Sequence, residues 1–267
     1  DGSLLFDEDG RNYIVYGNDE IWITELNEDL TAPKKDGLHR LLVSDHKNPE
    51  LGYEGSHIQK INGYYYIFLV HSLRDRWMRT EACFYSDSLE GEFTGGDVLC
   101  DDRGYCGQGV AQGGIVDTPD GKWYAMLFQD SGAVGRIPIL LPVTWKDHFP
   151  VFGQNGHVPE EIEICSTRPD YIYQPLVGSD DFHNGLLPHW QFNHDPDPRY
   201  YHLDALQGTY TITTREVCTE LTQAVNTLTQ RMSYPSCAAE VTVDASALKE
   251  GDVAGLCALQ SCYAAVG

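Results

Sequence analysis

The chain has 267 residues, with 18 lysines and arginines against 40 aspartates and glutamates, which gives a formal net charge of −22. This length allows one or two domains, and a composition with 42% hydrophobic and 11% aromatic residues excludes a disordered or fibrous chain. The acidic balance argues against a nucleic-acid backbone or an anionic membrane as partner, and the apolar runs are too short to span a bilayer. Neutral or cationic partners remain, and neutral carbohydrate fits the aromatic content.

The first half of the chain repeats one hairpin pattern three times, over residues 4–16, 57–68 and 115–128. Each copy has a strand, an Asp-Gly or Asn-Gly turn and an aromatic-rich second strand, since these dipeptides adopt the positive φ angles of tight turns. The turn glycines are Gly10, Gly63 and Gly121, so the repeats are 53 and 58 residues apart. Repeats of this size made only of strands are typical of β-propeller blades.

A polar side chain lies nine residues before each of these turn glycines, at Asp1, Glu54 and Gln112. Each is followed by glycine and then by serine or glycine. Because the innermost strand of every propeller blade lines the central channel, we expect the three side chains to converge at one mouth of that channel. The small neighbours leave room for a ligand or for backbone to approach closely.

The second half of the chain lacks this repeat. Residues 154–178 are polar and contain proline, which predicts a linker or ordered strap between a partial β-propeller catalytic domain (1–153) and a partial β-sandwich domain (179–267). Residues 209–213 and 238–243 are predicted sandwich strands. Since the chain begins on strand-like sequence and stops within an apolar run, we expect a fragment of a longer protein, truncated at both ends.

The eight cysteines show no C-x-x-C spacing and are too sparse for a disulfide scaffold. We expect scattered, mostly buried thiols. A bridge between Cys100 and Cys106 is left open. The compartment also stays open, with a lean to the cytoplasm, because the sequence shows no disulfide framework.

Two carboxyl groups at a channel mouth suit glycoside hydrolysis, in which one is a protonated acid and the other a base or nucleophile. Burial or a neighbouring carboxylate keeps such an acid protonated near neutral pH, and Asp1 and Glu54 on adjacent blades suit that relation. Binding of a hard metal ion such as calcium is the rival use of convergent carboxylates, although calcium usually takes more acidic ligands than are in register here.

Several segments resemble glycoside hydrolase family 43, and their order and spacing make the resemblance specific; they are residues 1–10, 54–58, 112–118, 135–138 and 142–145. Residues 190–194 and 224–231 are similar to the C-terminal β-sandwich that some members carry. The resemblance implies an all-β chain, with about three blades of a five-bladed propeller followed by a partial concanavalin-like sandwich. The family comprises β-xylosidases, α-L-arabinofuranosidases and arabinanases.

By this resemblance, three acidic residues carry an inverting mechanism. Glu54 matches the general acid, and Asp1 matches the residue that tunes the pKa of the acid and orients the substrate. The general base matches no residue of this sequence and is expected upstream. We therefore expect the chain by itself not to hydrolyse ordinary glycosides.

Four further residues are candidate substrate contacts. Arg136 matches an arginine that reaches the sugar in the innermost subsite, and a guanidinium offers several fixed donors to hydroxyls. Gln112 stands where many relatives have a histidine, which weakens any metal site there, so we expect no cofactor beyond a structural calcium at most. Trp77 could stack on a sugar ring, and His57 lies close to Glu54, with a packing role as the alternative for both.

The leading interpretation is an inverting glycoside hydrolase that releases xylose or arabinofuranose from xylan- or arabinan-derived oligosaccharides. A non-catalytic carbohydrate-binding protein with a propeller and a sandwich is the alternative. A fructan enzyme of family 32 or 68 shares the architecture, but its motifs differ around Glu54 and Arg136. The sequence separates neither the two pentoses nor the oligomeric states.

Overall fold

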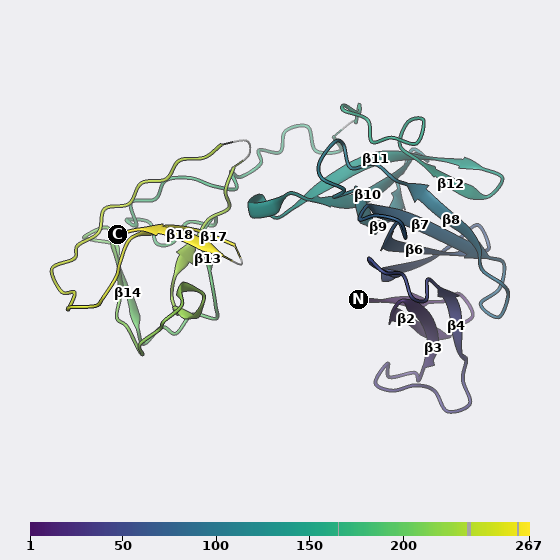
Figure 1. The fold of residues 1–267 in the computed structure, drawn as a ribbon, viewed down its shortest axis with the longest axis horizontal. Coiled ribbons are helices and arrows are strands. Elements are labelled where there is room, and N and C mark those ends of the chain that lie inside the picture. Colours follow the sequence, from purple (N-terminus) through teal and green to yellow (C-terminus); the bar gives the residue numbers. More distant parts are fainter. Residues whose placement is uncertain (165, 234–235, 261) are drawn as a thin grey trace. The chain divides into compact units, whose positions relative to one another are not determined.

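The computed structural model describes residues 1–164, 166–233, 236–260 and 262–267. The chain forms two compact units, Asp1–Cys165 (unit 1) and Ser166–Gly267 (unit 2), both visible in Figure 1. Within the described residues, the only helices are the short 3₁₀ turns η1 (Gly132–Val134) and η2 (Leu221–Gln223). The predicted all-β class is therefore confirmed. None of the described helices has the length and apolar character of a membrane span.

Unit 1 contains three four-stranded antiparallel sheets, and each is formed by consecutive strands (Figure 1). The first sheet consists of β1 (Gly2–Phe6), β2 (Asn12–Asn18), β3 (Glu20–Leu26) and β4 (His39–Ser44). The second consists of β5 (Glu54–Ile61), β6 (Tyr64–Ser72), β7 (Arg79–Ser86) and β8 (Thr94–Leu99). The third consists of β9 (Ala111–Asp117), β10 (Trp123–Asp130), β11 (Arg136–Lys146) and β12 (Phe149–Phe152). Such consecutive sheets are the blades of a partial propeller, as predicted.

The three predicted hairpins are the first two strands of each sheet: β1–β2, β5–β6 and β9–β10. Their turn glycines have positive φ angles of 84°, 85° and 79° at Gly10, Gly63 and Gly121. A Cβ atom at any of the three would meet nothing within 4 Å. Glycine is therefore used in these turns for its backbone conformation rather than for close packing.

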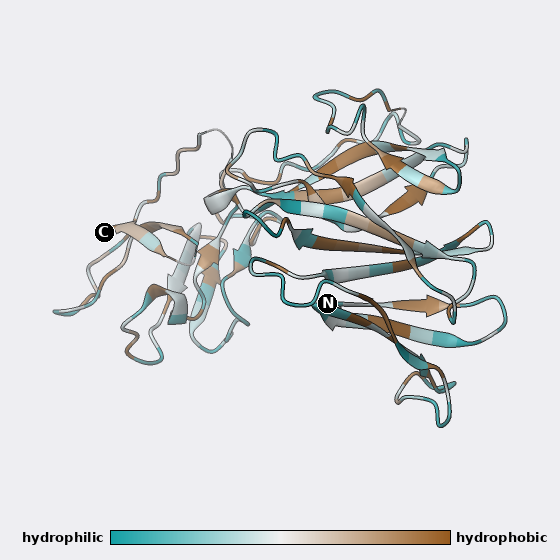
Figure 2. Ribbon diagram, turned by 45° about the vertical axis from the view of Figure 1, so that its right-hand side comes forward, coloured by the Kyte–Doolittle hydropathy of each residue, from teal (hydrophilic) through white to brown (hydrophobic). Residues whose placement is uncertain are grey.

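The second sheet is buried on both faces, which explains the continuous apolar run of β6. Tyr65, Ile67 and Leu69 pack in a core cluster shared with the first sheet, together with Tyr13, Val15, Ile21 and Ile23. Tyr66 and Phe68 point the other way, into a cluster shared with the third sheet, together with Ile115, Leu127 and Leu141. Alternate residues of β6 thus pack against the first sheet and against the third. Figure 2 shows that the hydrophobic stretches follow the strands of unit 1.

A buried carboxylate also joins the first sheet to the second. Asp7 is 7% exposed and accepts hydrogen bonds from Lys60 Nζ at 2.6 Å and from the Tyr65 hydroxyl at 2.5 Å. Burial by itself would raise the pKa of Asp7, but the bonds from Lys60 and Tyr65 outweigh it and lower the pKa below its ordinary value. Asp7 is therefore ionised and paired in the folded protein.

The described residues of unit 2 form three two-stranded antiparallel sheets. They pair β13 (Gln191–Phe192) with β16 (Leu228–Thr229), β14 (Tyr201–Asp204) with β15 (Thr209–Ile212), and β17 (Leu256–Leu259) with β18 (Tyr263–Val266). The predicted strand at 209–213 is confirmed by β15. The predicted strand at 238–243 is wrong, because these residues are exposed and pair with no other strand.

The first residues of the predicted strap belong to unit 1 and pack on its core. Val158 donates its amide to Asp101 Oδ2 at 2.8 Å and packs against the core between the second and third sheets. Gln154 and His157 close a small turn through two backbone hydrogen bonds. The domain limits 1–153, 154–178 and 179–267 stay a prediction.

The prediction of mostly buried thiols is wrong for the described cysteines. Seven are free, and of these only Cys83, on β7, is buried. The others are exposed or half-buried because they lie in loops or at the margins of short sheets, and the pair Cys100 and Cys106 is not bridged. Cys165 lies outside the described residues.

We expect Asp7→Asn to lower the free energy of unfolding of the intact protein by about 1–3 kcal/mol at neutral pH, because Lys60 and Tyr65 lose a buried ionised acceptor. Since the folded pKa of Asp7 is depressed, this stabilisation is present above the unfolded value of about 3.9 and is lost as the pH falls through the folded value. Urea unfolding at several pH values should show the difference from wild type shrinking below about pH 4. Asp9→Asn, at an exposed ion pair with Arg11, is the control, and an equal effect of both variants would contradict the assignment.

Candidate active site

The three residues predicted to converge lie at the starts of the innermost strands. Asp1 directly precedes β1, Glu54 begins β5, and Gln112 is the second residue of β9. Gln112 Nε2 donates to Asp1 Oδ2 at 3.0 Å, and a Cβ atom on Gly55 would lie 2.7 Å from the same Nε2. The structure therefore brings Asp1, Gln112 and the backbone beside Glu54 into one cluster, which we call the channel mouth.

Hydrogen bonds from one sheet to the next hold this end of the strands together. Ile58 donates its amide to Ser3 Oγ at 3.0 Å, and Ser56 Oγ donates to the carbonyl of Val15 at 2.9 Å. Ser3 follows Gly2, and Ser56 follows Gly55, so these are the small residues noted beside Asp1 and Glu54 in the sequence. These serines thus fasten β5 to the first sheet just beyond the channel mouth.

The strand pairing of β5 with β6 and of β9 with β10 does not follow the equal count of nine residues back from each turn glycine. β5 has a bulge between Glu54 and His57, and β9 has one opposite Met126 and Phe128. His57 pairs with Phe68 and Gly114 pairs with Met126, and each partner lies five residues after its turn glycine. Gln112 therefore corresponds to Gly55 rather than to Glu54, so the predicted equivalence of Glu54 and Gln112 is wrong by one position. Both have left-handed backbone, with φ of 63° at Gly55 and 70° at Gln112.

Glu54 is half-buried, and its carboxylate is held from the neighbouring sheet. Asn18, the last residue of β2, donates its side-chain amide to Glu54 Oε2 at 2.9 Å. Because this bond engages only one oxygen, Glu54 Oε1 can face a ligand. Sequence reasoning missed Asn18, since its proximity to Glu54 arises from the packing of two blades rather than from any motif.

Two charged residues lie buried beneath the channel mouth, at alternate positions of β7. Arg79 is 4% exposed and Glu81 is 0% exposed. Glu81 Oε2 accepts a hydrogen bond from the backbone amide of Gln112 at 2.7 Å, and Arg79 Nη2 donates to Gln112 Oε1 at 3.4 Å. Burial raises the pKa of Glu81 well above its ordinary value and lowers that of Arg79. Arg79 and Glu81 are charged residues in a strand that is buried on both faces. This unusual placement could have indicated the site from the sequence.

Arg136 begins β11 and has an exposed guanidinium with a defined position. Its Nε lies 3.2 Å from Asp130 Oδ1, and its guanidinium carbon lies 4.5 Å from the centre of the Phe128 ring. Asp130 also pairs with Arg79 Nη1 at 3.3 Å. The same carboxylate therefore connects Arg136 to the buried arginine beneath Gln112.

Trp77 and His57 are both accessible to solvent. Trp77 is 40% exposed in the loop between β6 and β7, next to Gly107, and the exposed Tyr105 lies in the loop between β8 and β9. The His57 ring lies against Gly114, where an added Cβ atom would be 3.6 Å from Nδ1, and desolvation by the surrounding protein lowers the pKa of His57, so its imidazole is neutral near pH 7. Tyr105 is a second accessible aromatic that the sequence analysis did not select.

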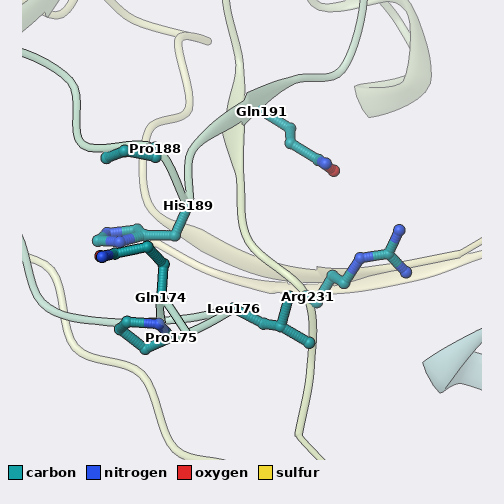
Figure 3. Close-up of a pocket in the computed structure, with 7 residues that line it drawn as sticks. All are labelled: Gln174, Pro175, Leu176, Pro188, His189, Gln191 and Arg231. Carbon is teal, nitrogen blue, oxygen red and sulfur yellow. The ribbon is translucent and has the colours of Figure 1, made fainter. Parts of the chain in front are cut away.

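Two cavities lie away from the channel mouth. A cavity of about 200 Å³ in unit 2 is lined by seven residues, among them His189 and Arg231 (Figure 3). A second, of about 310 Å³, lies between the far ends of β5 and β9, with Lys60 and Trp123 in its wall. Neither contains a residue selected from the sequence. No cluster of three or more metal-binding side chains occurs among the residues that the structure describes.

The family model "Glycosyl hydrolases family 43" matches residues 1–150, and the model "Beta xylosidase C-terminal Concanavalin A-like domain" matches residues 179–267. The chain therefore belongs to glycosyl hydrolase family 43, and its C-terminal part is of the concanavalin A-like type. This confirms the resemblance drawn from the sequence motifs.

The relatives agree with this membership. The chain is 26% identical to the "Xylosidase/arabinosidase 43B" of Humicola insolens, over 98% of this chain and 52% of that protein. Among solved structures, a bifunctional GH43-CE protein of Bacteroides eggerthii is 41% identical with a TM-score of 0.75, over 88% of this chain and 30% of that chain. A xylan β-1,4-xylosidase of Bacillus halodurans shares the fold, with 21% identity and a TM-score of 0.66 over 87% of this chain and 48% of that one. The chain spans about half the length of two curated relatives that match 98% of it.

We expect Gly55→Ala to lower kcat/KM of the intact protein on an aryl glycoside at least ~10-fold, because the new Cβ atom would lie 2.7 Å from Gln112 Nε2 and displace the amide from Asp1. Gly63→Ala is the matched control. It carries a similar backbone strain of about 1–2 kcal/mol, at a φ of 85° against 63°, but it has open space around its Cβ position. Equal losses of activity in the two variants would show that strain alone, rather than displacement of Gln112, is responsible.

Proposed function

We propose that the intact protein is an inverting glycosidase that removes xylose or arabinofuranose from oligosaccharides derived from xylan or arabinan. The observation that carries this proposal is the meeting of Asp1, Gln112 and the start of β5, which bears Glu54, at one channel mouth. Two carboxyl groups and an ordered amide at the starts of three innermost strands suit the binding and cleavage of a single glycosidic bond. Family membership supports the reaction class.

Glu54 is the general acid of this proposal. Its Oε2 accepts the amide of Asn18, which sets the plane of the carboxyl group, and its Oε1 remains for the glycosidic oxygen. Proton transfer from Glu54 to that oxygen lets the bond to the sugar carbon break as positive charge develops on the ring. The aglycone then leaves as a neutral alcohol.

Asp1 orients the sugar and supplies a negative charge that favours the protonated form of the acid. Gln112 Nε2 donates to one oxygen of Asp1, which fixes the carboxylate and leaves its other oxygen for a sugar hydroxyl. Inversion further requires a base and a water on the opposite side of the sugar, with carboxyl groups roughly 6.5–9.5 Å apart. By the family resemblance, this base is an aspartate of another blade.

Arg136, His57 and Trp77 are the proposed contacts to the rest of the sugar. Asp130 and Phe128 hold Arg136 so that its exposed guanidinium can donate to hydroxyl groups. Neutral His57 can both donate and accept. The exposed face of Trp77 can stack on a pentose, whose C–H groups are weakly apolar. A neutral sugar suits this site, because the charges of Arg79 and Arg136 are already paired with Asp130.

We expect Glu54→Gln in the intact protein to lower kcat/KM at least ~100-fold on a xylo-oligosaccharide and much less on a nitrophenyl pentoside. The reason is that nitrophenolate is a good leaving group and needs little protonation, whereas a sugar alkoxide needs a general acid. Initial rates on paired nitrophenyl xyloside and arabinofuranoside, and on the matching oligosaccharides, measure both effects and show which pentose is preferred.

Glu90→Gln, in the exposed turn between β7 and β8, is the control and should leave both rates unchanged. A similar loss on both substrate types would remove Glu54 from the role of general acid. If the intact wild-type protein binds pentose oligosaccharides but hydrolyses none, it is the carbohydrate-binding alternative.

A further inference from the structure

Glu81 is a buried carboxyl group that the proposed mechanism does not use. It lies on β7, in the middle sheet, and its side chain is fully buried. Oε2 accepts the backbone amide of Gln112 from the next sheet, whereas Oε1 has no hydrogen-bond partner among the described residues. Keeping a partly unsatisfied carboxyl group in a core is unfavourable, so a role beyond packing is expected for it.

The residue that Glu81 holds has an unfavourable backbone conformation. Gln112 has φ of 70°, in the left-handed region that side-chain-bearing residues seldom adopt, and it lies in the bulge of β9. In the second sheet the corresponding place is taken by Gly55, which adopts this conformation without strain. A fixed acceptor opposite its amide is therefore needed to hold Gln112 there.

The same network determines which way the side-chain amide of Gln112 points. Arg79 has only donors, so it faces Gln112 Oε1, and the Asp1 carboxylate accepts, so it faces Nε2. Asp130 pairs with Arg79 and also with Arg136, so the buried arginine is held from its other side. Glu81 fixes the backbone of Gln112, and Arg79 fixes its amide.

We propose that Glu81 is a positioning residue of the active site, acting from the middle blade through the backbone amide of Gln112 to hold Asp1 in place beside Glu54. This proposal rests on the proposed function and assigns to Glu81 the role of hydrogen-bond acceptor rather than of charge. The burial that raises the pKa of Glu81 is consistent with a neutral acceptor. Glu81 itself touches neither substrate nor reacting atoms.

The test compares Glu81→Met and Glu81→Gln in the intact protein. Methionine fills a similar volume without accepting from Gln112, whereas glutamine keeps an acceptor and cannot ionise. We expect Glu81→Met to lower kcat/KM on nitrophenyl pentosides at least ~10-fold and to move the alkaline limb of its pH profile to lower pH by ~0.5 unit or more, because Asp1 no longer favours the protonated acid. Glu81→Gln should keep kcat/KM within about threefold of wild type and leave the limb in place.

A double-mutant cycle with Gln112→Ala tests the route of the effect. If Glu81 acts through Gln112, the double variant Glu81→Met/Gln112→Ala should lose no more activity than Gln112→Ala alone. Additive losses, an unmoved alkaline limb in Glu81→Met, or a Glu81→Gln variant as impaired as Glu81→Met would each overturn the proposal. An inactive wild-type protein would instead refute the proposed function, so the two failures are distinguishable.

Discussion

The two-sided burial of the middle sheet is the constraint on which the rest of unit 1 depends. Alternate residues of β6 enter two different cores, so the first and third sheets are each fixed against the second. Once these faces are packed, the starts of β1, β5 and β9 must lie at the same end of the assembly. The channel mouth is therefore a consequence of core packing and does not depend on any one loop.

A site built in this way needs polar groups beneath it that the core can tolerate. Arg79 and Glu81 alternate along β7 and are buried, and each makes contacts across the boundary between two blades. Burying a guanidinium and a carboxyl group is unfavourable unless both are engaged, and Asp130 and Gln112 supply most of the needed partners. The specificity of their hydrogen bonds fixes Gln112 and Arg136 at the surface above. The core and the site are thus connected by a few directional contacts.

The hairpins and their convergence could be predicted from the sequence because they depend on local rules. Asn62-Gly63 and Asp120-Gly121 specify turns, and the spacing between turns defines the blade. The register of Gln112 could not be predicted, because the segment from Gly114 to Gly121 is one residue longer than the segment from His57 to Gly63, and this difference appears only when the strands pair. Asn18 and Glu81 were missed because their partners come from other blades. The strand predicted at 238–243 was wrong because an apolar alternation gives no strand unless a partner lies beside it.

A crystal structure of the intact protein with xylose or arabinose bound is the most direct measurement of the central claim. The account predicts one sugar ring at the channel mouth, with hydrogen bonds to Glu54 Oε1, to Asp1 and to Arg136, and with Gln112 still bonded to Asp1. A sugar bound elsewhere on unit 1 while these side chains remain in contact with solvent would contradict it.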